Sequence, residues 1–200
     1  MTFLFDIGRV LLDFDFEASL ARLFPDGDSN LAARMERMLD RKDEFEAGRI
    51  GADAYIAWAI DVIGSPVTAA EFRHAWQQIF TPNEPMWACV RKLAAEGHRL
   101  ILFSNTNGIH CPWVFEEFPE FDLFAAGVLS FQTGFIKPEP EIYHYAIDQH
   151  GLVPADTLYI DDLPQNIATG RELGFRCWQY DMNDHASFET WLAENLKSKI

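Results

Sequence analysis

The second half of the chain alternates helix-like segments with short apolar segments, and this alternation restricts the possible folds more than any other feature of the sequence. In three repeats the helix-like segment ends at a glycine, which can take the left-handed conformation that closes a helix. The paired segments are 84–96 with 99–103, 139–150 with 157–160, and 164–173 with 175–180. Such alternation is typical of βαβ units, whose parallel strands carry helices on both faces. The sequence therefore predicts an α/β fold with a Rossmann-like, doubly wound parallel sheet.

The N-terminal part of the chain combines one further strand with a long helical stretch. An apolar run leads up to Asp6 and is followed by a glycine turn, which is the pattern of a buried strand. Apolar residues then recur at helical spacing, with a turn at 25–28 and a capping box formed by Thr68 and Glu71. We therefore expect a small helical cap inserted after the first strand. The expected cap covers residues 16–84, and the expected core covers residues 1–15 and 85–200.

The acidic composition makes some classes of partner improbable. The formal net charge of the 200-residue chain is −15, and such a surface repels nucleic acids and anionic lipid. The apolar runs are too short to span a bilayer. The three cysteines have no metal-ligand spacing and fit free thiols in a reducing compartment. We expect a cytoplasmic protein, monomeric or weakly dimeric, that binds neither nucleic acid nor membranes.

Polar side chains follow the predicted strands. An open parallel sheet binds its ligands at the carboxyl ends of its strands. The polar residues at or beyond these ends are Asp6, Ser104, Asn105, Lys137, Asp161 and Asp162. Lys137 comes after the strand expected at 127–131, and the others directly end a strand. We therefore expect all of them to face one crevice.

These residues together suit the chemistry of phosphoryl transfer. Clustered carboxylates raise one another's pKa, and a hard divalent cation such as Mg²⁺ removes that conflict. Lys137 adds a positive charge, and Ser104 adds a hydroxyl group. A carboxylate nucleophile, a metal, a lysine and a hydroxyl group can hold a phosphoryl group and move it. The sequence thus predicts a small phosphorylated metabolite as the ligand.

Four segments resemble, in chain order, the four motifs of the haloacid dehalogenase superfamily of hydrolases. The segments are Phe-Asp-Ile-Gly-Arg-Val-Leu at 5–11, Ile-Leu-Phe-Ser-Asn at 101–105, Lys-Pro at 137–138, and Tyr-Ile-Asp-Asp-Leu-Pro-Gln-Asn at 159–166. Further matches at 104–107, 110, 118–120, 129–130 and 137–139 resemble bacterial sugar-phosphate phosphatases, including those acting on α-D-glucose 1-phosphate. The resemblance implies a Mg²⁺-dependent phosphomonoester hydrolase, with a sugar phosphate as substrate.

The resemblance also implies a role for each matched residue. Asp6 would attack phosphorus and form an aspartyl phosphate. The implied Mg²⁺ ligands are Asp6, the carbonyl of Gly8, Asp161 and Asp162. The implied contacts to the substrate are Ser104, Asn105, Lys137 and His110. Ser104 and Lys137 would also take part in catalysis, since they stabilise the developing charge.

Gly8 departs from the superfamily pattern. Most phosphatases of the superfamily carry a second aspartate there, which protonates the leaving oxygen, and loss of a general acid costs about 10²–10⁴ in rate. Three interpretations stay open: a substrate with an easy leaving group such as a sugar 1-phosphate, another acid such as Asp13 or Asp15, or a weakly active phosphate-binding protein. A metal-independent 2-haloacid dehalogenase is a further alternative, although the Asp161–Asp162 pair and Gly8 argue against it. A phosphotransferase or mutase usually needs the acid that Gly8 lacks.

Two other features leave alternatives open. Arg9 either helps to hold an anionic substrate or pairs with a neighbouring carboxylate. A charged segment of the cap either faces the crevice and selects substrates or forms a solvated helix face. Its residues are Arg41, Lys42, Glu44 and Phe45.

Overall fold

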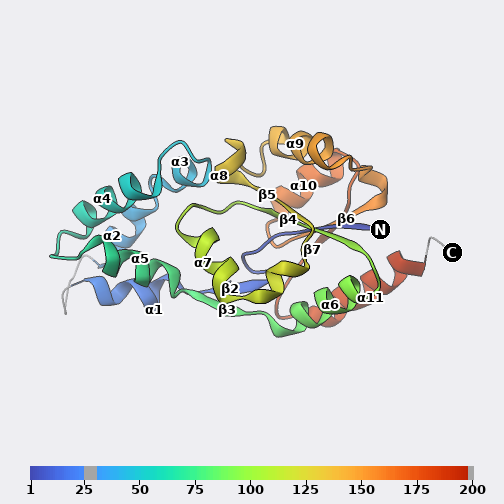
Figure 1. Ribbon diagram of the computed structural model, residues 1–200, viewed down its shortest axis with the longest axis horizontal. Coiled ribbons are helices and arrows are strands. Elements are labelled where there is room, and N and C mark those ends of the chain that lie inside the picture. Colours follow the sequence, from blue (N-terminus) through green and yellow to red (C-terminus); the bar gives the residue numbers. More distant parts are fainter. Residues whose placement is uncertain (25–30, 198–200) are drawn as a thin grey trace.

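A parallel sheet forms the centre of the molecule (Figure 1). The structure is a computed structural model that describes residues 1–24 and 31–197, so the turn expected at 25–28 lies outside the described residues. Within these ranges five strands pair in the order β5-β4-β1-β6-β7, all of them parallel. The strands are β1 (Thr2–Phe5), β4 (Arg99–Ser104), β5 (Ala126–Leu129), β6 (Thr157–Asp161) and β7 (Arg176–Gln179). The predicted doubly wound α/β fold is confirmed.

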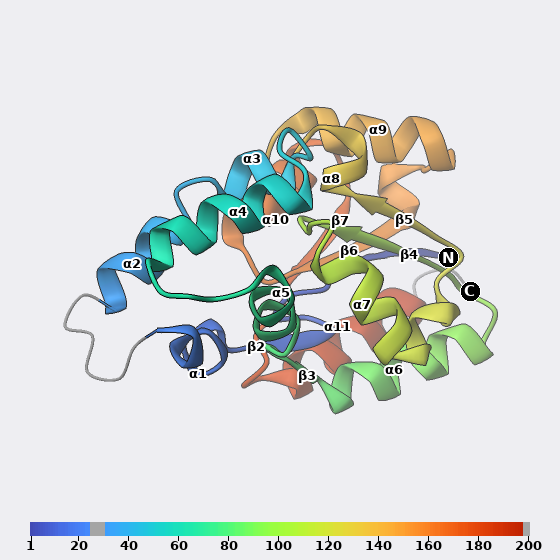
Figure 2. The same ribbon diagram turned by 60° about the vertical axis from the view of Figure 1, so that its left-hand side comes forward.

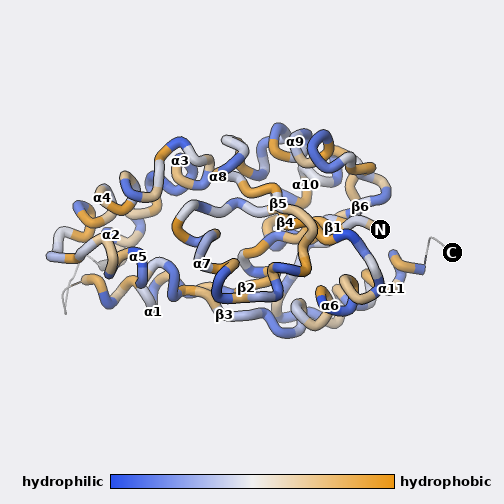
Figure 3. The backbone as a smooth tube through the Cα atoms, viewed as in Figure 1, coloured by the Kyte–Doolittle hydropathy of each residue, from blue (hydrophilic) through white to orange (hydrophobic). Residues whose placement is uncertain are grey.

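Helices cover both faces of the sheet because successive strand residues point to opposite sides. Phe3 and Phe5 of β1 belong to a hydrophobic cluster with α6 and α11, whereas Leu4 belongs to one with α9 and α10. The hydrophobic colouring of the central strands in Figure 3 agrees with their burial between these layers. The helices are α6 (Glu84–Ala95), α9 (Pro140–His150), α10 (Pro164–Glu172) and α11 (His185–Lys197). No helix of the described chain is both long and apolar enough to cross a membrane.

The segment between β1 and α6 forms a second group of helices with a core of its own. Its helices are α1 (Phe16–Leu20), α2 (Leu31–Met38), α3 (Lys42–Glu46), α4 (Ala52–Ile63) and α5 (Ala69–Gln77). Phe45, Tyr55 and Trp76 belong to a hydrophobic cluster separate from those of the sheet. The capping box of Thr68 and Glu71 is present at the start of α5, as predicted. Figure 2 shows these helices at one end of the sheet.

The segment 16–84, which was predicted to be helical, contains a strand. β3 (Phe80–Pro82) pairs antiparallel with β2 (Leu12–Phe14), and the two strands join the helical segment to the sheet. Three residues ending in a proline give no periodic pattern, so the sequence could not reveal this strand. The division into a cap at 16–84 and a core at 1–15 and 85–200 stays a prediction, and we propose that β2 and β3 form its connecting stalk.

Helix α7 (His110–Glu117) was not predicted from the sequence. Pro112 lies in its first turn, where a proline is tolerated because the first N–H groups of a helix have no partner within it. The strand expected at 127–131 ends at Leu129, since a short helix begins at Ser130. The remaining elements are α8 (Ser130–Thr133), η1 (Ala21–Leu23), η2 (Pro119–Leu123) and η3 (Pro154–Asp156).

Candidate active site

The polar residues at the carboxyl ends of the strands meet at one cavity of about 270 Å³. Asp6 directly follows β1, while Ser104 and Asp161 are the last residues of β4 and β6. The sequence-derived candidates that line the cavity are Asp6, Gly8, Ser104, Asn105, His110, Lys137 and Asp162, together with Lys42 from the charged segment. Asp161 is fully buried beside them. The parallel sheet therefore brings these residues to one place, because its strand ends lie along one edge.

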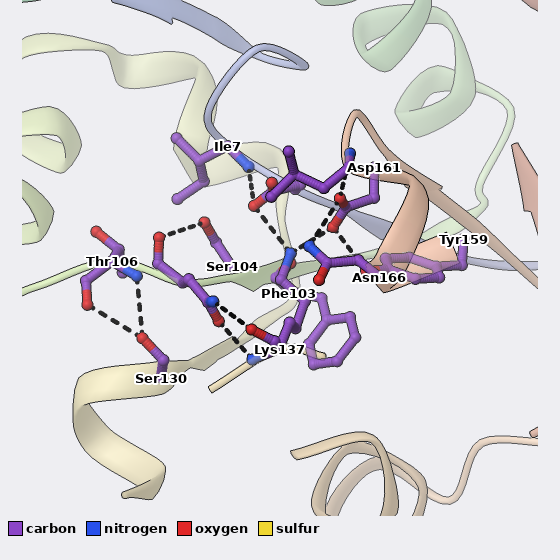
Figure 4. A network of polar contacts seen from close by, with 12 residues as sticks. Ile7, Phe103, Ser104, Thr106, Ser130, Lys137, Tyr159, Asp161 and Asn166 are labelled. Carbon is purple, nitrogen blue, oxygen red and sulfur yellow. Dashed lines mark hydrogen bonds and ion pairs between the residues drawn. The ribbon is translucent and has the colours of Figure 1, made fainter. Parts of the chain in front are cut away.

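Lys137 connects the two strand-end carboxylates. Its Nζ lies 3.1 Å from Asp6 Oδ1 and 2.6 Å from Asp161 Oδ2, and it donates to the carbonyl of Phe103 at 2.8 Å. Figure 4 shows Lys137 and Asp161 in this polar network. Burial alone would lower the pKa of Lys137, but Asp161 and Asp6 outweigh burial and raise its pKa above the usual value. The lysine is therefore held in its charged form.

Asn105 fixes the loop that carries Lys137. Its side-chain amide donates to the carbonyl of Lys137 at 2.9 Å, and its side-chain oxygen accepts from the N–H of Lys137 at 2.8 Å. The bond between Lys137 and Pro138 is cis. Ser130 holds the loop after β4 in a similar way, since its hydroxyl contacts both the N–H and the carbonyl of Thr106. Two loops distant in sequence are thus locked together at the site.

Asp161 is saturated with hydrogen-bond donors. Lys137 Nζ and the Tyr159 hydroxyl, both at 2.6 Å, donate to Oδ2. The N–H of Leu163 and the side-chain amide of Asn166, both at 2.9 Å, donate to Oδ1. Asp162 instead lines the cavity. Of the two neighbouring aspartates, Asp162 therefore presents its carboxylate more openly to a ligand.

The three aspartates form a group of oxygen donors suited to a hard cation. One carboxylate oxygen from each of Asp6, Asp161 and Asp162 lies within 4.8 Å of the others. Burial raises the pKa of Asp6 to about 6, with Lys137 lowering it and Asp161 raising it. Burial, followed by the charges of Asp6 and Asp161, raises the pKa of Asp162 to about 7. A divalent cation with oxygen ligands, such as Mg²⁺, would relieve this repulsion, so the donor set fits that ion.

Gly8 is constrained by Phe14. A Cβ atom at Gly8 would lie 3.1 Å from a ring carbon of Phe14, which also lines the cavity. This separation is tighter than ordinary van der Waals contact, so a side chain at position 8 would require Phe14 to move. The ring of Phe14 in turn lies 4.4 Å below the guanidinium carbon of Arg9. The absence of an acid at position 8 is thus matched by the packing around it.

Arg9 pairs with a neighbouring carboxylate, which is the second of the two alternatives for this residue. It forms an ion pair with Asp13 and donates to the carbonyl of Phe14 at 2.9 Å. Arg9 is not among the described residues that line the cavity, and neither are Asp13 and Asp15. The geometry therefore gives no support to Arg9 as a substrate contact or to either aspartate as the replacement acid.

His110 lines the cavity, but its ring nitrogens are already engaged. Nε2 lies 3.0 Å from the carbonyl of Trp76 and Nδ1 lies 3.1 Å from the side-chain amide of Asn107. Burial lowers the pKa of His110 to about 3, so the ring is neutral. Within the described structure these contacts leave neither nitrogen for a substrate. His110 instead links the loop after β4 to helix α5, and the geometry does not support the predicted substrate contact.

Two residues of α3 reach the cavity. Lys42, one of the predicted candidates, lines it together with Glu46, which was not among them. The spacing of four residues places both on the same face of a helix, so the position of Lys42 in the sequence could have indicated Glu46 as well. Arg41 pairs with Glu44 on the exposed side at 2.6 Å, and Phe45 stacks on Tyr55 in the hydrophobic cluster of the helical segment. The charged segment therefore divides between the cavity and the solvated surface.

Comparisons with known proteins agree with this geometry. The profile of the haloacid dehalogenase-like hydrolase family matches residues 1–174. A D-ribitol-5-phosphate phosphatase of Bacteroides thetaiotaomicron is 30% identical over 190 residues, covering 88% of this chain and 89% of that protein. The haloacid dehalogenase family enzyme BT-2542 of the same organism, in complex with magnesium and inorganic phosphate, superposes with a TM-score of 0.80. That structure is 28% identical and covers 90% of this chain and 94% of its own.

A more distant structure shares the fold alone. L-2-haloacid dehalogenase of Xanthobacter autotrophicus superposes with a TM-score of 0.64 at 16% identity, over 88% of this chain and 75% of its own.

Proposed function

The chain belongs to the haloacid dehalogenase-like hydrolases, and from this premise we propose that it is a magnesium-dependent phosphatase acting on a small phosphorylated sugar or polyol. The observation that carries the proposal is the buried Lys137 between Asp6 and Asp161, with Asp162 beside them. A fixed positive charge beside a carboxylate nucleophile suits phosphoryl transfer, in which positioning and charge stabilisation provide most of the catalysis. The similarity to a D-ribitol-5-phosphate phosphatase supports the class of substrate.

Asp6 is the proposed nucleophile. Its Oδ1 accepts from the N–H of Ile7 at 2.8 Å and lies 3.1 Å from Lys137 Nζ, which orients the second oxygen for attack. That oxygen forms a bond to phosphorus while the bond to the leaving oxygen breaks, and an aspartyl phosphate results. Water then attacks the phosphorus, which releases inorganic phosphate and restores the carboxylate. The proposed partners of the phosphoryl oxygens are the hydroxyl of Ser104 and the backbone N–H of Asn105, since both residues line the cavity beside Asp6.

The proposed magnesium ligands are Asp6, Asp162 and the carbonyl of Gly8. Asp161 has a supporting role, because its four hydrogen-bond donors hold it in place beside Lys137. When bound, magnesium supplies positive charge that offsets the carboxylates and the phosphoryl oxygens.

The leaving oxygen must obtain its proton without a side chain at position 8. A sugar 1-phosphate needs this proton less than other substrates, because an anomeric hydroxyl is more acidic than an ordinary alcohol. D-ribitol 5-phosphate, by contrast, has a primary alcohol as its leaving group. We propose that an easy leaving group is preferred, and a higher rate on glucose 6-phosphate than on α-D-glucose 1-phosphate would argue against this.

Phosphate release from these three substrates, with Mg²⁺ or with EDTA, tests the proposed function. We expect release that requires Mg²⁺. Asp6→Asn should lower kcat by on the order of 10³-fold or more, because it removes the nucleophile. Asp148→Asn, an exposed aspartate on α9, is the matched control and should behave as wild type. Activity that survives EDTA, or an Asp6→Asn variant as active as the control, would contradict the mechanism.

A further inference from the structure

Helix α3 of the cap presents a buried carboxylate to the cavity that the proposed mechanism does not use. We propose that Glu46, with Lys42 beside it, binds hydroxyl groups on the organic part of the substrate and so selects phosphorylated polyols and sugars. This inference rests on the proposed function, since it concerns the substrate of the same cavity. The cavity joins Glu46 and Lys42 from the cap to Asp6 from the sheet.

The Glu46 carboxylate is buried at the edge of the cavity. Glu46 is 8% exposed, and its Oε2 is buried without a hydrogen bond from any described residue. Lys42 Nζ lies 3.3 Å from this oxygen as an ion pair, while the lysine side chain is half exposed. A buried polar group without hydrogen bonds destabilises a fold. Its Oε2 therefore has the charge of Lys42 beside it but no well-aligned hydrogen bond, and ionisable groups perturbed by burial and one charged partner are common in ligand-binding clefts.

Electrostatics restrict what this carboxylate can bind. Burial raises the pKa of Glu46, Lys42 lowers it, and Asp43 and Asp6 raise it further. A carboxylate repels a phosphoryl group, which Lys137 and Ser104 are placed to receive at the strand ends. Hydroxyl groups, however, donate hydrogen bonds to a carboxylate and accept them from an ammonium group. The Glu46–Lys42 pair therefore matches the hydroxyl groups of a sugar or polyol rather than its phosphate.

A second buried polar atom belongs to a residue near Glu46. A small hollow of about 20 Å³ adjoins the cavity, shares Lys42 and Glu46 with it, and is also lined by Trp76. The indole N–H of Trp76 is buried and has no acceptor among the described residues. Trp76 thus offers a donor without a partner, and Glu46 offers a carboxylate whose Oε2 has the Lys42 ammonium group beside it. Both residues line one region, which suits hydroxyl groups because they both donate and accept.

The position of α3 over the cavity is fixed by a close backbone contact. Gly48, two residues beyond Glu46, has φ of +67° and lies against the backbone of Phe131 in α8. A Cβ atom at Gly48 would clash with the carbonyl oxygen of Phe131. Figures 1 and 2 both show α3 beside α8. The cap therefore meets the core next to the cavity. A substrate bound there can contact both Glu46 and the residues at the strand ends.

Two substrates separate recognition of hydroxyl groups from phosphate chemistry. One is D-ribitol 5-phosphate or α-D-glucose 1-phosphate, whichever the wild type hydrolyses faster, and the other is p-nitrophenyl phosphate, which has no hydroxyl group. We expect Glu46→Ala to lower the ratio of their kcat/KM values by roughly 10- to 100-fold, as for loss of hydrogen bonds to a charged group. Glu46→Gln, which keeps the shape, should lower the ratio less. Glu44→Gln, on the exposed side of α3, is the matched control and should keep the wild-type ratio.

The outcomes distinguish this inference from the proposed function. If the wild type releases phosphate from no substrate, the proposed function is refuted. If the wild type hydrolyses only p-nitrophenyl phosphate, or if both Glu46 variants keep the wild-type ratio, the role of Glu46 is refuted while the phosphatase assignment stands. The Glu46→Gln variant keeps the test decisive if Glu46→Ala fails to fold.

Discussion

Lys137→Met removes a buried charge that holds two carboxylates, and its effect on stability can be worked out from the structure. The lysine side chain is 1% exposed, and Nζ lies 3.1 Å from Asp6 and 2.6 Å from Asp161. Breaking a buried ion pair by removing one partner destabilises a protein by about 3–5 kcal/mol. Methionine fills similar space, so little of this loss comes from packing. For a chain of this size, that free energy corresponds to a fall in Tm of roughly 6–20 °C.

The assay is thermal unfolding followed by circular dichroism, in EDTA, at pH 8 and pH 5. The fall in Tm should be larger at pH 8, because at pH 5 the carboxyl groups left without the lysine can take up protons. Lys92→Met makes the same change at an exposed lysine of α6 and should shift Tm little. If Lys137→Met lowers Tm no more than Lys92→Met does at pH 8, the lysine does not hold the carboxylates as described.

Three further predictions concern the surroundings of the site. Gly8→Asp should lower Tm without raising kcat, because the new Cβ atom would lie 3.1 Å from the Phe14 ring. Differential scanning fluorimetry measures the Tm, and steady-state kinetics measures kcat. Gly48→Ala should lower Tm and raise KM, because the positive φ and the Phe131 carbonyl both oppose a side chain; an unchanged KM would count against contact between cap and core at this point. In EDTA the free energy of unfolding should fall from about pH 4 to pH 7. In the folded chain the pKa of Asp6 is raised to about 6 and that of Asp162 to about 7, from a usual value of 3.8. As the pH rises, the unfolded chain therefore releases these protons before the folded chain does. Mg²⁺ should therefore raise Tm more at pH 8 than at pH 5. If titration with Mg²⁺ raises Tm equally at the two pH values, the metal site is contradicted.

The sequence predicts the parallel sheet and the strand-end residues well, because both follow from local patterns. Apolar strands alternate with glycine-capped helices, and a parallel sheet places its strand ends on one edge. The contacts that determine the role of each site residue do not follow from local patterns. The pairing of Asn105 with the Lys137 loop and the approach of Phe14 to Gly8 depend on distances between separate segments, which periodicity does not encode. The burial of Glu46 likewise depends on how the cap lies over the core.

The geometry of β6 also accounts for the unequal positions of Asp161 and Asp162. Successive side chains of a strand point to opposite sides, so Tyr159 and Asp161 share one side, and the tyrosine hydroxyl indeed donates to Asp161. That side carries the donors from Lys137 and Asn166, which satisfy both oxygens of Asp161. Asp162 points elsewhere and borders the cavity, where burial and the two neighbouring carboxylates disfavour its charge. Both oxygens of Asp161 are therefore occupied by donors of the protein itself, whereas Asp162 is left to face a ligand in the cavity.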